Sequence, residues 1–394
     1  MKTLYINARF IDRPVTGVER VARELTRTLL EHHTDTDGCI RVDAQRFRLK
    51  LIAPRNSAGA TSFCNYPIWR KSLVGDAGYP LRALYGHFWE QFELPLLTRD
   101  GSLLSLCNVA TLVKRDQFVF IHDAQPFAIP KNFKPWARAW YQLNYRVGAK
   151  RAKGVLVNSK FTKNELQYFI DLDPQKIKVC PLGCDHIHRI DIEPNERTRI
   201  SEPFVLAFAA QNPNKNFRLI TNTIRLMGND APLLVVVGDP DNRIFADANL
   251  PENRALHLGR VSDTELSYLL CQADALLYPS IYEGFGLPPL EAMALGCPVI
   301  VSNQGALPEV VGEAGLYCEI DSERSLAAKL RLIKSSSVQA SALQRRGRDR
   351  AAEYTWQRCA ASLIQALNTD TNQQHCVAAN SNSPQFREIT NAKT

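Results

Sequence analysis

The sequence predicts an α/β protein made of two doubly wound parallel sheets, each in its own domain. Apolar strand-like segments alternate with helical segments along most of the chain, which favours parallel sheets. The chain has 394 residues, too many for one compact α/β core of ordinary size, and 45% of them are apolar, enough to fill two cores. We therefore expect two similar domains of nearly two hundred residues each.

The first half begins with a strand, a helix and a further series of strands. The helix over residues 17–31 is predicted by an apolar stripe that includes Val21, Leu25 and Leu29, and by a capping box formed by Thr16 and Glu19. The expected strands of this half cover residues 4–8, 49–53, 103–106, 118–122 and 155–158. These elements define a first domain over residues 1–190.

The second half starts after a polar, charged and proline-containing stretch at residues 187–203, which is typical of a domain boundary. The expected strands of this half cover residues 204–209, 233–237, 257–258, 275–278, 298–301 and 316–318. A second doubly wound domain over residues 200–345 follows from this series. Long helices are expected over residues 343–367, joined near Tyr354, Thr355 and Trp356, and the polar residues 368–394 are expected to form a disordered tail.

One segment of the second half, residues 278–303, carries the most specific information about function. Glu283 and Glu291 flank a Gly284-Phe285-Gly286 turn that opens a helix at Leu287. The free N–H groups at a helix start favour a phosphate, and a glutamate before the turn can bond a sugar hydroxyl. The segment therefore indicates a site for a sugar nucleotide.

Further short motifs occur in order along the chain. They are Thr16-Gly17-Val18-Glu19-Arg20, His122-Asp123, Val157-Asn158-Ser159, Pro181-Leu182-Gly183-Cys184-Asp185, Asn214-Lys215-Asn216 and Leu258-Gly259-Arg260. Together with the glutamate pair, this collinear set resembles family 4 of the retaining glycosyltransferases, also called glycosyl transferases group 1. The resemblance implies the GT-B fold, in which two Rossmann-like domains face each other across a cleft. It also implies that the helix over residues 346–367 crosses back to the first domain.

The resemblance further implies a retaining, metal-independent hexosyltransferase that uses a nucleotide-diphosphate sugar as donor. Glu291 is expected to hold the ribose, and Glu283 a hydroxyl of the donor sugar. The backbone of Gly284, Phe285, Gly286 and Leu287 is expected to contact the donor. In the first half the similarity is to transferases of bacterial surface polysaccharide assembly, many of them mannosyltransferases, so GDP-mannose is the expected donor. The expected acceptor is a saccharide or a lipid-linked saccharide.

Two residues besides Glu283 are expected to act in catalysis. His122, at a strand end, is expected to lie beside the anomeric centre of the donor, and Lys215 to neutralise the diphosphate as the sugar leaves. Family members carry an arginine shortly before this lysine, whereas this chain has Gln211 and Asn212 there. These neutral side chains can donate hydrogen bonds, and Arg260 and Arg218 are candidates for the missing cation.

Gly17, at the start of the first predicted helix, is a further candidate for donor binding. A glycine lets a ligand approach the backbone, and the N–H groups of a first helical turn point outward. The family often has two glycines at this place, and this chain has one.

The charge of the chain limits the classes of partner. The net charge is +8, which suits an anionic nucleotide or an anionic membrane surface and is too small to indicate nucleic acid. Residues 131–153 combine seven basic residues with Trp136, Trp140 and Tyr141, so they form either a membrane-contacting surface or an amphipathic helix with buried aromatic side chains. We expect a cytoplasmic protein, with peripheral contact to the inner membrane face as an option, because the N-terminus has a strand pattern and not a signal-peptide profile.

No cofactor or metal is expected. Cys180, Cys184, His186 and His188 lie close together, but their spacing matches no common zinc pattern. Asp239 and Asp241 imitate the two-aspartate metal motif of the GT-A glycosyltransferases, but they follow a strand of the second domain and are interpreted as a turn.

Two alternative functions stay open. The same fold occurs in nucleotide-sugar epimerases and hydrolases, which would convert the donor without an acceptor. The missing arginine also allows a catalytically silent subunit that binds a nucleotide sugar.

Overall fold

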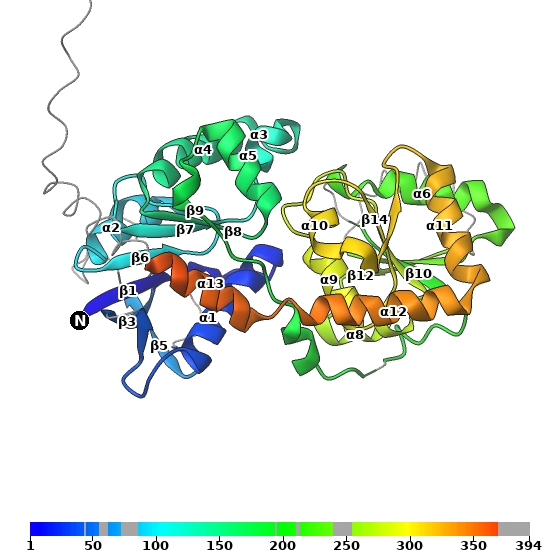
Figure 1. Cartoon of the computed structure of the whole chain (residues 1–394), viewed down its shortest axis with the longest axis horizontal. Helices are drawn as coiled ribbons and strands as arrows, with labels where there is room; N and C mark the ends of the chain where they lie inside the picture. The colour runs from blue at the N-terminus through cyan, green and yellow to red at the C-terminus, as the bar shows by residue number, and fades with distance from the viewer. Residues whose placement is uncertain are drawn as a thin grey trace, which may run out of the picture.

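The structure, a computed structural model, describes residues 1–42, 45–54, 62–71, 86–193, 195–209, 213–238 and 254–368. Its main strands form one sheet of nine strands and one of six. Helices cover both faces of each sheet, and the two resulting domains lie side by side along the long axis of the molecule (Figure 1). This arrangement of two Rossmann-like domains is the GT-B fold predicted from the sequence.

The first sheet has a parallel centre with antiparallel additions at one side. Its strands are ordered β4-β5-β3-β1-β6-β7-β8-β9, with β2 paired to β3. The parallel strands are β1 (Lys2–Asn7), β3 (Gln45–Pro54), β5 (Tyr66–Lys71), β6 (Ser102–Ser105), β7 (Gln117–Ile121), β8 (Gly154–Val157) and β9 (Ile177–Val179). The antiparallel strands are β2 (Cys39–Val42) and β4 (Ser62–Phe63). The sequence did not predict β2, β4, β5 or β9, because these strands are short or interrupt their apolar residues with polar ones.

The second sheet is entirely parallel, in the order β12-β11-β10-β13-β14-β15. Its strands are β10 (Phe204–Phe208), β11 (Leu233–Val237), β12 (Ala255–Gly259), β13 (Ala275–Tyr278), β14 (Val299–Ser302) and β15 (Leu316–Cys318). Every residue of β11, β13 and β14 is buried. These continuous apolar runs are typical of parallel strands with helices on both faces.

Helix α1 (Gly17–His32) confirms the first predicted helix, but its N-terminus differs from the prediction. Thr16 makes no side-chain bond to the backbone of the first turn, so the predicted capping box is wrong. Its hydroxyl donates to the carboxylate of Glu19, which also accepts from Arg13 at 2.9 Å. In a capping box the Glu19 carboxylate would accept from the backbone N–H of Thr16. Here it pairs with Arg13 instead.

The other helices of the first domain are short. They are α2 (Leu94–Leu97), α3 (Gln125–Ala128), α4 (Pro135–Leu143) and α5 (Lys160–Ile170), with π-helical segments at Trp89–Glu93 and Asn144–Ala149. The second domain contains α6 (Phe217–Met227), α8 (Asp263–Gln272), α9 (Leu287–Ala294), α10 (Leu307–Val311), α11 (Glu323–Ser335) and α12 (Ser337–Ala352).

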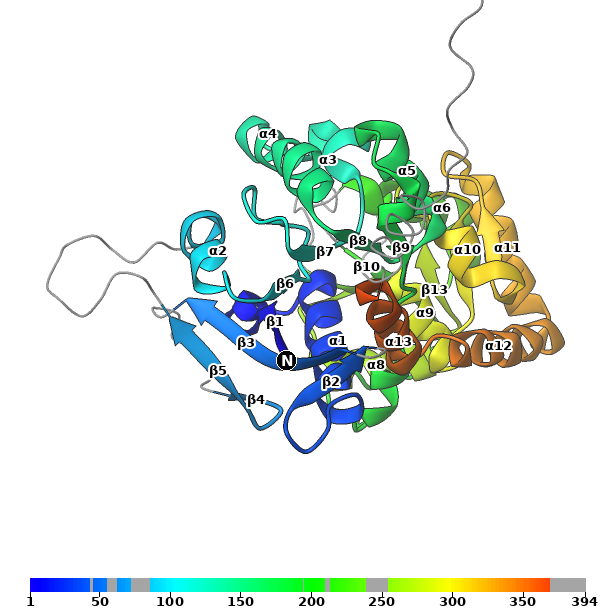
Figure 2. The same ribbon diagram turned by 60° about the vertical axis from the view of Figure 1, so that its left-hand side comes forward.

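The chain crosses between the domains twice. The first crossing follows β9 through a 3-10 helix, Asp185–Arg189, and the second runs from α12 into α13 (Trp356–Leu367). Helix α13 packs against α1 of the first domain, as both views show (Figures 1 and 2). The predicted boundary at residues 345–346 lies inside α12, so the second crossing is made by residues 353–355.

Residues 369–394, for which a disordered tail was expected, lie outside the described residues. Within the described chain, no helix combines the length and the apolar composition that crossing a membrane requires.

Candidate functional site

The predicted site residues come together where the two sheets direct their carboxyl ends toward the domain interface. His122 follows β7 of the first domain, Lys215 follows β10, and Glu283 follows β13. Because β10 and β13 are hydrogen-bonded neighbours, the segments after them lie side by side although Lys215 and Glu283 are 68 positions apart in the chain. The carboxyl ends of parallel strands are where doubly wound sheets bind their ligands.

Three polar side chains surround the first of the two glutamates and form a cluster with it. Lys215 Nζ lies 2.7 Å from Glu283 Oε1, and the same oxygen accepts from the hydroxyls of Ser280 at 2.7 Å and Tyr278 at 3.1 Å. Lys215 also donates to the Tyr278 hydroxyl and lies over the Tyr278 ring, 4.5 Å from its centroid. One cation is therefore held in a fixed position at the end of the second sheet.

The electrostatics of this cluster favour a permanently charged lysine. Burial works to lower the pKa of Lys215, but the neighbouring charge of Glu283 and the bonds to Glu283 and Tyr278 raise it above its ordinary value. Burial raises the pKa of the Tyr278 phenol. The Lys215 ammonium therefore stays protonated at any physiological pH.

The turn between β13 and α9 packs directly against the first domain. A Cβ atom on Gly284 would lie 2.0 Å from the carbonyl oxygen of His122, so only glycine allows this approach. The Gly284 carbonyl accepts from the hydroxyls of Ser159 at 2.7 Å and Thr162 at 3.1 Å, both at the start of α5. Gly286 has φ +103°, a conformation that favours glycine.

His122 is buried, and one of its ring nitrogens is hydrogen-bonded within the protein. Its Nε2 atom lies 2.8 Å from the Leu106 carbonyl oxygen, which can only accept, so the proton of the neutral ring is on Nε2. The ring stacks on Phe120, 4.8 Å between centroids. Burial lowers the pKa of His122 to about 4, so the ring is neutral near pH 7. The Nδ1 atom then carries a lone pair that can accept a hydrogen bond from a ligand.

Asp123 is the next residue and has the opposite shift. Burial raises its pKa to about 6, and the charge of Glu283 adds to this, while the backbone N–H of Gln125 and the charge of Lys215 work to lower it. The Gln125 N–H donates to Asp123 Oδ1 at 3.0 Å. Asp123 therefore lies within electrostatic reach of the Lys215 cluster, although it comes from the other domain.

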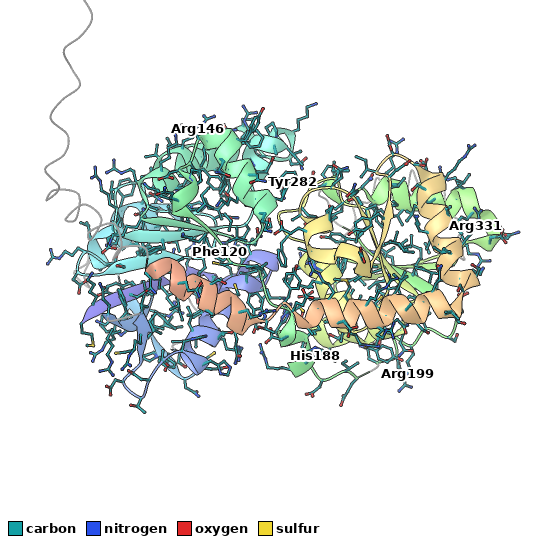
Figure 3. All side chains as sticks on the ribbon, in the orientation of Figure 1. Phe120, Arg146, His188, Arg199, Tyr282 and Arg331 are labelled. Atoms are coloured by element: carbon teal, nitrogen blue, oxygen red, sulfur yellow. The ribbon has the colours of Figure 1, made fainter. Side chains whose placement is uncertain are left out.

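Several side chains hold the two domains against each other around this site. Tyr282, which Figure 3 labels at the domain interface, accepts from the Ala124 N–H at 3.1 Å and donates to Glu165 Oε2 at 3.2 Å. The Glu309 carboxylate of α10 accepts from the backbone N–H of Lys160 at 2.9 Å and Phe161 at 3.2 Å. A carboxylate from the second domain thus caps α5 of the first.

Glu291, the second glutamate, lies in a separate environment within α9. Its side chain is 10% exposed, and its Oε1 atom lies 3.0 Å from Nε2 of His186, whose side chain is 3% exposed. The Trp356 indole N–H donates to Nδ1 of the same imidazole at 3.1 Å. His186 lies in the first chain crossing and Trp356 directly follows the second, so the environment of Glu291 is built where the chain passes between the domains.

Arg20 reaches the same region from α1. Its Nη2 atom donates to Asp263 Oδ1 of the second domain at 2.6 Å. Burial works to lower the pKa of Arg20, but the bond to Asp263 and the charges of Glu291 and Glu24 raise it above its ordinary value. A cation of the first domain therefore lies close to the second predicted glutamate.

The structure places the remaining predicted residues as follows. Gly17 is exposed at the start of α1, and a Cβ atom there would meet no atom within 4 Å. Arg260 follows the edge strand β12, at the same end of the sheet as Lys215 but two strands away, and its carbonyl faces Arg197 Nη2 at 3.5 Å. Arg218 is exposed on α6. Gln211 and Asn212 lie outside the described residues.

Cysteine and histidine side chains of the first crossing contact other protein groups rather than one another. The Cys184 thiol faces the Ala351 carbonyl oxygen, and His186 is held by Trp356, while His188 is exposed, as labelled in Figure 3. In the described part of the chain, no three His, Cys, Asp or Glu side chains are grouped to hold a metal ion. Asp239 and Asp241 lie outside the described residues.

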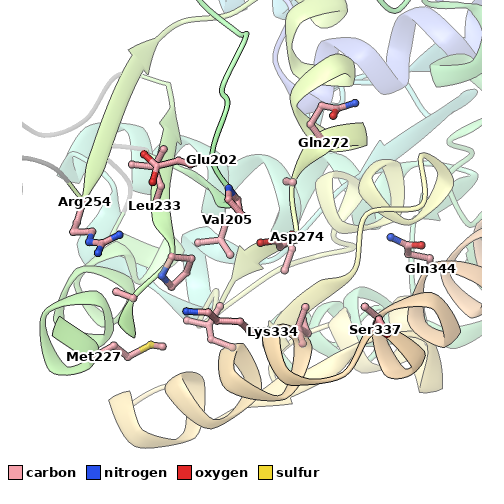
Figure 4. Close-up of a pocket in the computed structure, with 18 of the residues that line it drawn as sticks. Glu202, Val205, Met227, Leu233, Arg254, Gln272, Asp274, Lys334, Ser337 and Gln344 are labelled. Carbon is pink, nitrogen blue, oxygen red and sulfur yellow. The ribbon is translucent and has the colours of Figure 1, made fainter. Parts of the chain in front are cut away.

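A pocket of about 530 Å³ lies in the second domain, away from these residues (Figure 4). It is lined by residues at the amino ends of β10, β11 and β13, such as Val205, Leu233 and Asp274, together with Lys334 from α11. The amino ends are opposite to the ends that carry Lys215 and Glu283. The chemistry indicated by the motifs is therefore not located in this pocket.

Some contacts of the site were not predicted from the sequence. Tyr278 and Ser280 lie five and three positions before Glu283 in the chain. Their hydroxyl groups so near a candidate glutamate were a signal that could have identified them. The interactions made by Arg20 and His186 depend on how the domains meet, and no local pattern indicates them.

Comparison with known proteins identifies a matching family model and several relatives. The model for glycosyl transferases group 1 matches residues 189–350. The O-antigen chain mannosyltransferase RfbU of Salmonella typhimurium is 31% identical over 255 residues, which cover 63% of this chain and 69% of the relative. The O-antigen chain mannosyltransferase B of Escherichia coli is 29% identical over 263 residues, which cover 62% of this chain and 68% of the relative.

Solved structures share the fold over nearly the whole chain. Sucrose-phosphate synthase from Thermosynechococcus elongatus superposes with a TM-score of 0.67 at 17% identity, covering 96% of this chain and 99% of its own. Anabaena Alr3699/HepE in complex with UDP and glucose superposes with a TM-score of 0.66 at 16% identity, covering 94% and 100%. At these identities the likeness shows the fold alone.

Proposed function

The chain belongs to the glycosyl transferases group 1 and has the GT-B fold, and from this premise we propose that it is a retaining mannosyltransferase that uses GDP-mannose. The proposed acceptor is a saccharide or a lipid-linked saccharide of a surface polysaccharide. The names of RfbU and of mannosyltransferase B support the sugar and the kind of product.

The donor is proposed to bind mainly to the second domain. Glu291 accepts from the ribose hydroxyls and Glu283 from a hydroxyl of the donor sugar, while the turn from Gly284 to Leu287 contacts the sugar and the phosphates. The arrangement that supports this is the position of Glu283 before α9 and of Glu291 within it, with Lys215 fixed 2.7 Å from Glu283. Gly17 offers an unobstructed backbone from the first domain.

The proposed transfer breaks the bond between the anomeric carbon and the diphosphate oxygen, whose electron pair leaves with the diphosphate. The acceptor hydroxyl attacks the same face of the anomeric carbon, and its proton passes to the departing phosphate, so no enzyme nucleophile is used. The ammonium of Lys215 and the N–H groups of the turn stabilise the developing negative charge. The Nδ1 lone pair of His122 stabilises the positive charge on the sugar ring.

The missing arginine of the family pattern requires another source of positive charge. Arg20 is the charged side chain that the structure brings toward Glu291, and its bond to Asp263 joins the two domains. We propose that Arg20 contributes to the positive potential on the ribose side of the donor. No metal ion and no cofactor is proposed to take part.

A peripheral membrane contact is proposed for α4 and its surroundings. Trp136 is 70% exposed and Leu143 is 48% exposed, and Lys131, Lys134 and Arg138 are exposed beside them. Residues 131–153 contain no Asp or Glu. Exposed aromatic and basic side chains in one segment suit anionic lipid headgroups, which a lipid-linked acceptor would require. Co-sedimentation with anionic and neutral vesicles tests this contact.

The observation that carries the proposed function is the Lys215–Glu283 pair at the start of α9. The test begins with a thermal-shift screen of nucleoside diphosphates and their sugars. A ligand that binds only the folded protein at a hundred times its Kd stabilises it by about 2.7 kcal/mol. The selected donor is then supplied with candidate acceptors, and the anomeric configuration of the product is read by NMR.

Three results would contradict the proposal. Release of free sugar or of its epimer at the full rate without an acceptor would indicate a hydrolase or an epimerase. Nucleotide binding without transfer to any acceptor would indicate a silent subunit. An inverted product would contradict the retaining mechanism.

A further inference from the structure

The two crossings between the domains are bonded to each other beside Glu291. The Cys184 N–H donates to the Tyr354 carbonyl oxygen at 3.1 Å, and the Trp356 N–H donates to Asp185 Oδ1 at 2.7 Å. A Cβ atom on Gly183 would lie 2.2 Å from the Trp356 nitrogen, so the segments touch through their backbones. The crossings are therefore bonded into one unit between the domains.

His186 extends this unit to Glu291. The imidazole is buried between Trp356 of the second crossing and the Glu291 carboxylate of α9. Nε2 of His186 and Oε1 of Glu291 lie 3.0 Å apart, a close electrostatic contact outside hydrogen-bond geometry, and within the described chain neither of these buried atoms makes a hydrogen bond. The two atoms are therefore each other's polar neighbours in a buried space.

Trp356 determines which imidazole nitrogen carries the proton. An indole N–H can only donate, so Nδ1 of His186 accepts and the proton of the neutral ring is on Nε2. That N–H lies next to the carboxylate oxygen, where a lone pair would be repelled. With the opposite tautomer, both contacts of the imidazole would be lost.

We propose that His186 is a positioning residue for the donor: it fixes the Glu291 carboxylate in the orientation that accepts from the ribose hydroxyls, and Trp356 selects the tautomer that it needs. This inference rests on the proposed role of Glu291 in ribose binding. His186 does not touch the reacting atoms, so its effect is on donor affinity. Its carboxylate contact uses one oxygen of Glu291 and leaves the second for the ribose.

The test compares binding of the nucleoside diphosphate selected by thermal shift with binding of its 2′,3′-dideoxy analogue. In His186→Leu, the Kd of the ribonucleotide is expected to rise about tenfold, because the contact that holds the Glu291 carboxylate in place is lost. The Kd of the dideoxy analogue is expected to stay unchanged, because that ligand lacks the hydroxyls that Glu291 would bind. In turnover, the KM for the donor rises and kcat is retained.

Matched variants separate positioning from a general loss of structure. His186→Gln can donate from its amide nitrogen and is expected to restore most of the affinity. His188→Leu alters an exposed histidine of the same 3-10 helix and is expected to bind as the wild type does. Trp356→Phe keeps an aromatic ring but removes the N–H, so it is expected to reproduce the loss seen in His186→Leu while His186 is intact.

The outcomes distinguish this inference from the proposed function. If the wild type prefers the ribonucleotide and His186→Leu keeps the same preference, the positioning role is overturned and the donor site stands. If the wild type binds no nucleotide, the proposed function fails and this inference fails with it. If His186→Leu does not fold, the Trp356→Phe and His186→Gln proteins decide between the two results.

Discussion

Lys215 Nζ lies 2.7 Å from Glu283 Oε1, and the Tyr278 hydroxyl donates to the same oxygen at 3.1 Å. The cation and the carboxylate therefore hold each other in place before any ligand arrives. A donor that bonds Glu283 through a sugar hydroxyl would bring its phosphates to the side where the ammonium is fixed. Preorganised charge of this kind needs no rearrangement when negative charge develops on the leaving group.

Lys215→Met is expected to reduce kcat by a factor of about 10² to 10³, because it removes a fixed positive charge from the departing diphosphate. Glu283→Gln keeps the size of the side chain and is expected to lower kcat by a smaller factor. Steady-state kinetics with saturating donor measure both. Lys334→Met, which alters an exposed lysine on α11, serves as the control and is expected to retain full activity. Near-normal turnover in Lys215→Met would remove Lys215 from the mechanism.

Gly284→Ala and Gly17→Ala are expected to fail in different ways. A Cβ atom on Gly284 would clash with the His122 carbonyl oxygen at 2.0 Å, so this variant is expected to lose about 1 to 3 kcal/mol of stability and most of its activity. A Cβ atom on Gly17 meets no protein atom within 4 Å, so Gly17→Ala is expected to keep its Tm and to show a raised KM for the donor. Thermal melts and donor titrations check the two. An unchanged KM in Gly17→Ala would show that the donor does not approach this backbone.

Most of the fold was predictable because its signals are local. Continuous apolar runs such as Leu233–Val237 and Ala275–Tyr278 belong to buried parallel strands, and the glycines and prolines around Leu287 mark the start of α9. The strands that were missed have no such run: Tyr66–Lys71 contains a proline and two cations, and Ile177–Val179 has only three residues. Short and edge strands are specified by their neighbours in the sheet rather than by their own sequence.

The site was predictable only in part, for a similar reason. Lys215 and Glu283 follow strands that the sequence places in one domain, so their closeness could be inferred. The bonds of Gly284 to Ser159 and of Arg20 to Asp263 join different domains, and local patterns carry no information on how two domains meet. The capping box at Thr16 was a local prediction that tertiary structure overrode, because Arg13 binds the Glu19 carboxylate.

Glu309→Ala is expected to weaken the contact between the domains. The carboxylate accepts from the N–H groups of Lys160 and Phe161 at the start of α5, and losing such a cap costs about 1 to 2 kcal/mol. The melting temperature should fall by a few degrees, and hydrogen exchange should increase at the first turn of α5. Glu313→Ala, an exposed neighbour, is the control. Equal melting temperatures in the two variants would show that the cap does not stabilise the contact between the domains.

His122 and Asp123 are expected to contribute opposite slopes to the pH dependence of stability. Burial lowers the pKa of His122 to about 4, so between pH 4 and 6.5 the unfolded chain binds a proton that the folded chain does not, and stability rises with pH. Burial raises the pKa of Asp123 to about 6, so between pH 3.8 and 6 the folded chain keeps a proton that the unfolded chain releases, and stability falls as pH rises. In the wild type the two effects largely cancel between pH 4 and 6.

Asp123→Asn removes one of these effects and reveals the other. Relative to the wild type, its unfolding free energy should increase with pH between 4 and 6, with a slope of at most about 1.4 kcal/mol per pH unit, because one proton is involved. His122→Gln should show the opposite slope over the same range. Melting temperatures measured from pH 4 to 7 give both difference curves, and Asp321→Asn, at an exposed position, supplies the baseline. If the Asp123→Asn curve ran parallel to that of the wild type, Asp123 would not retain its proton in the folded protein.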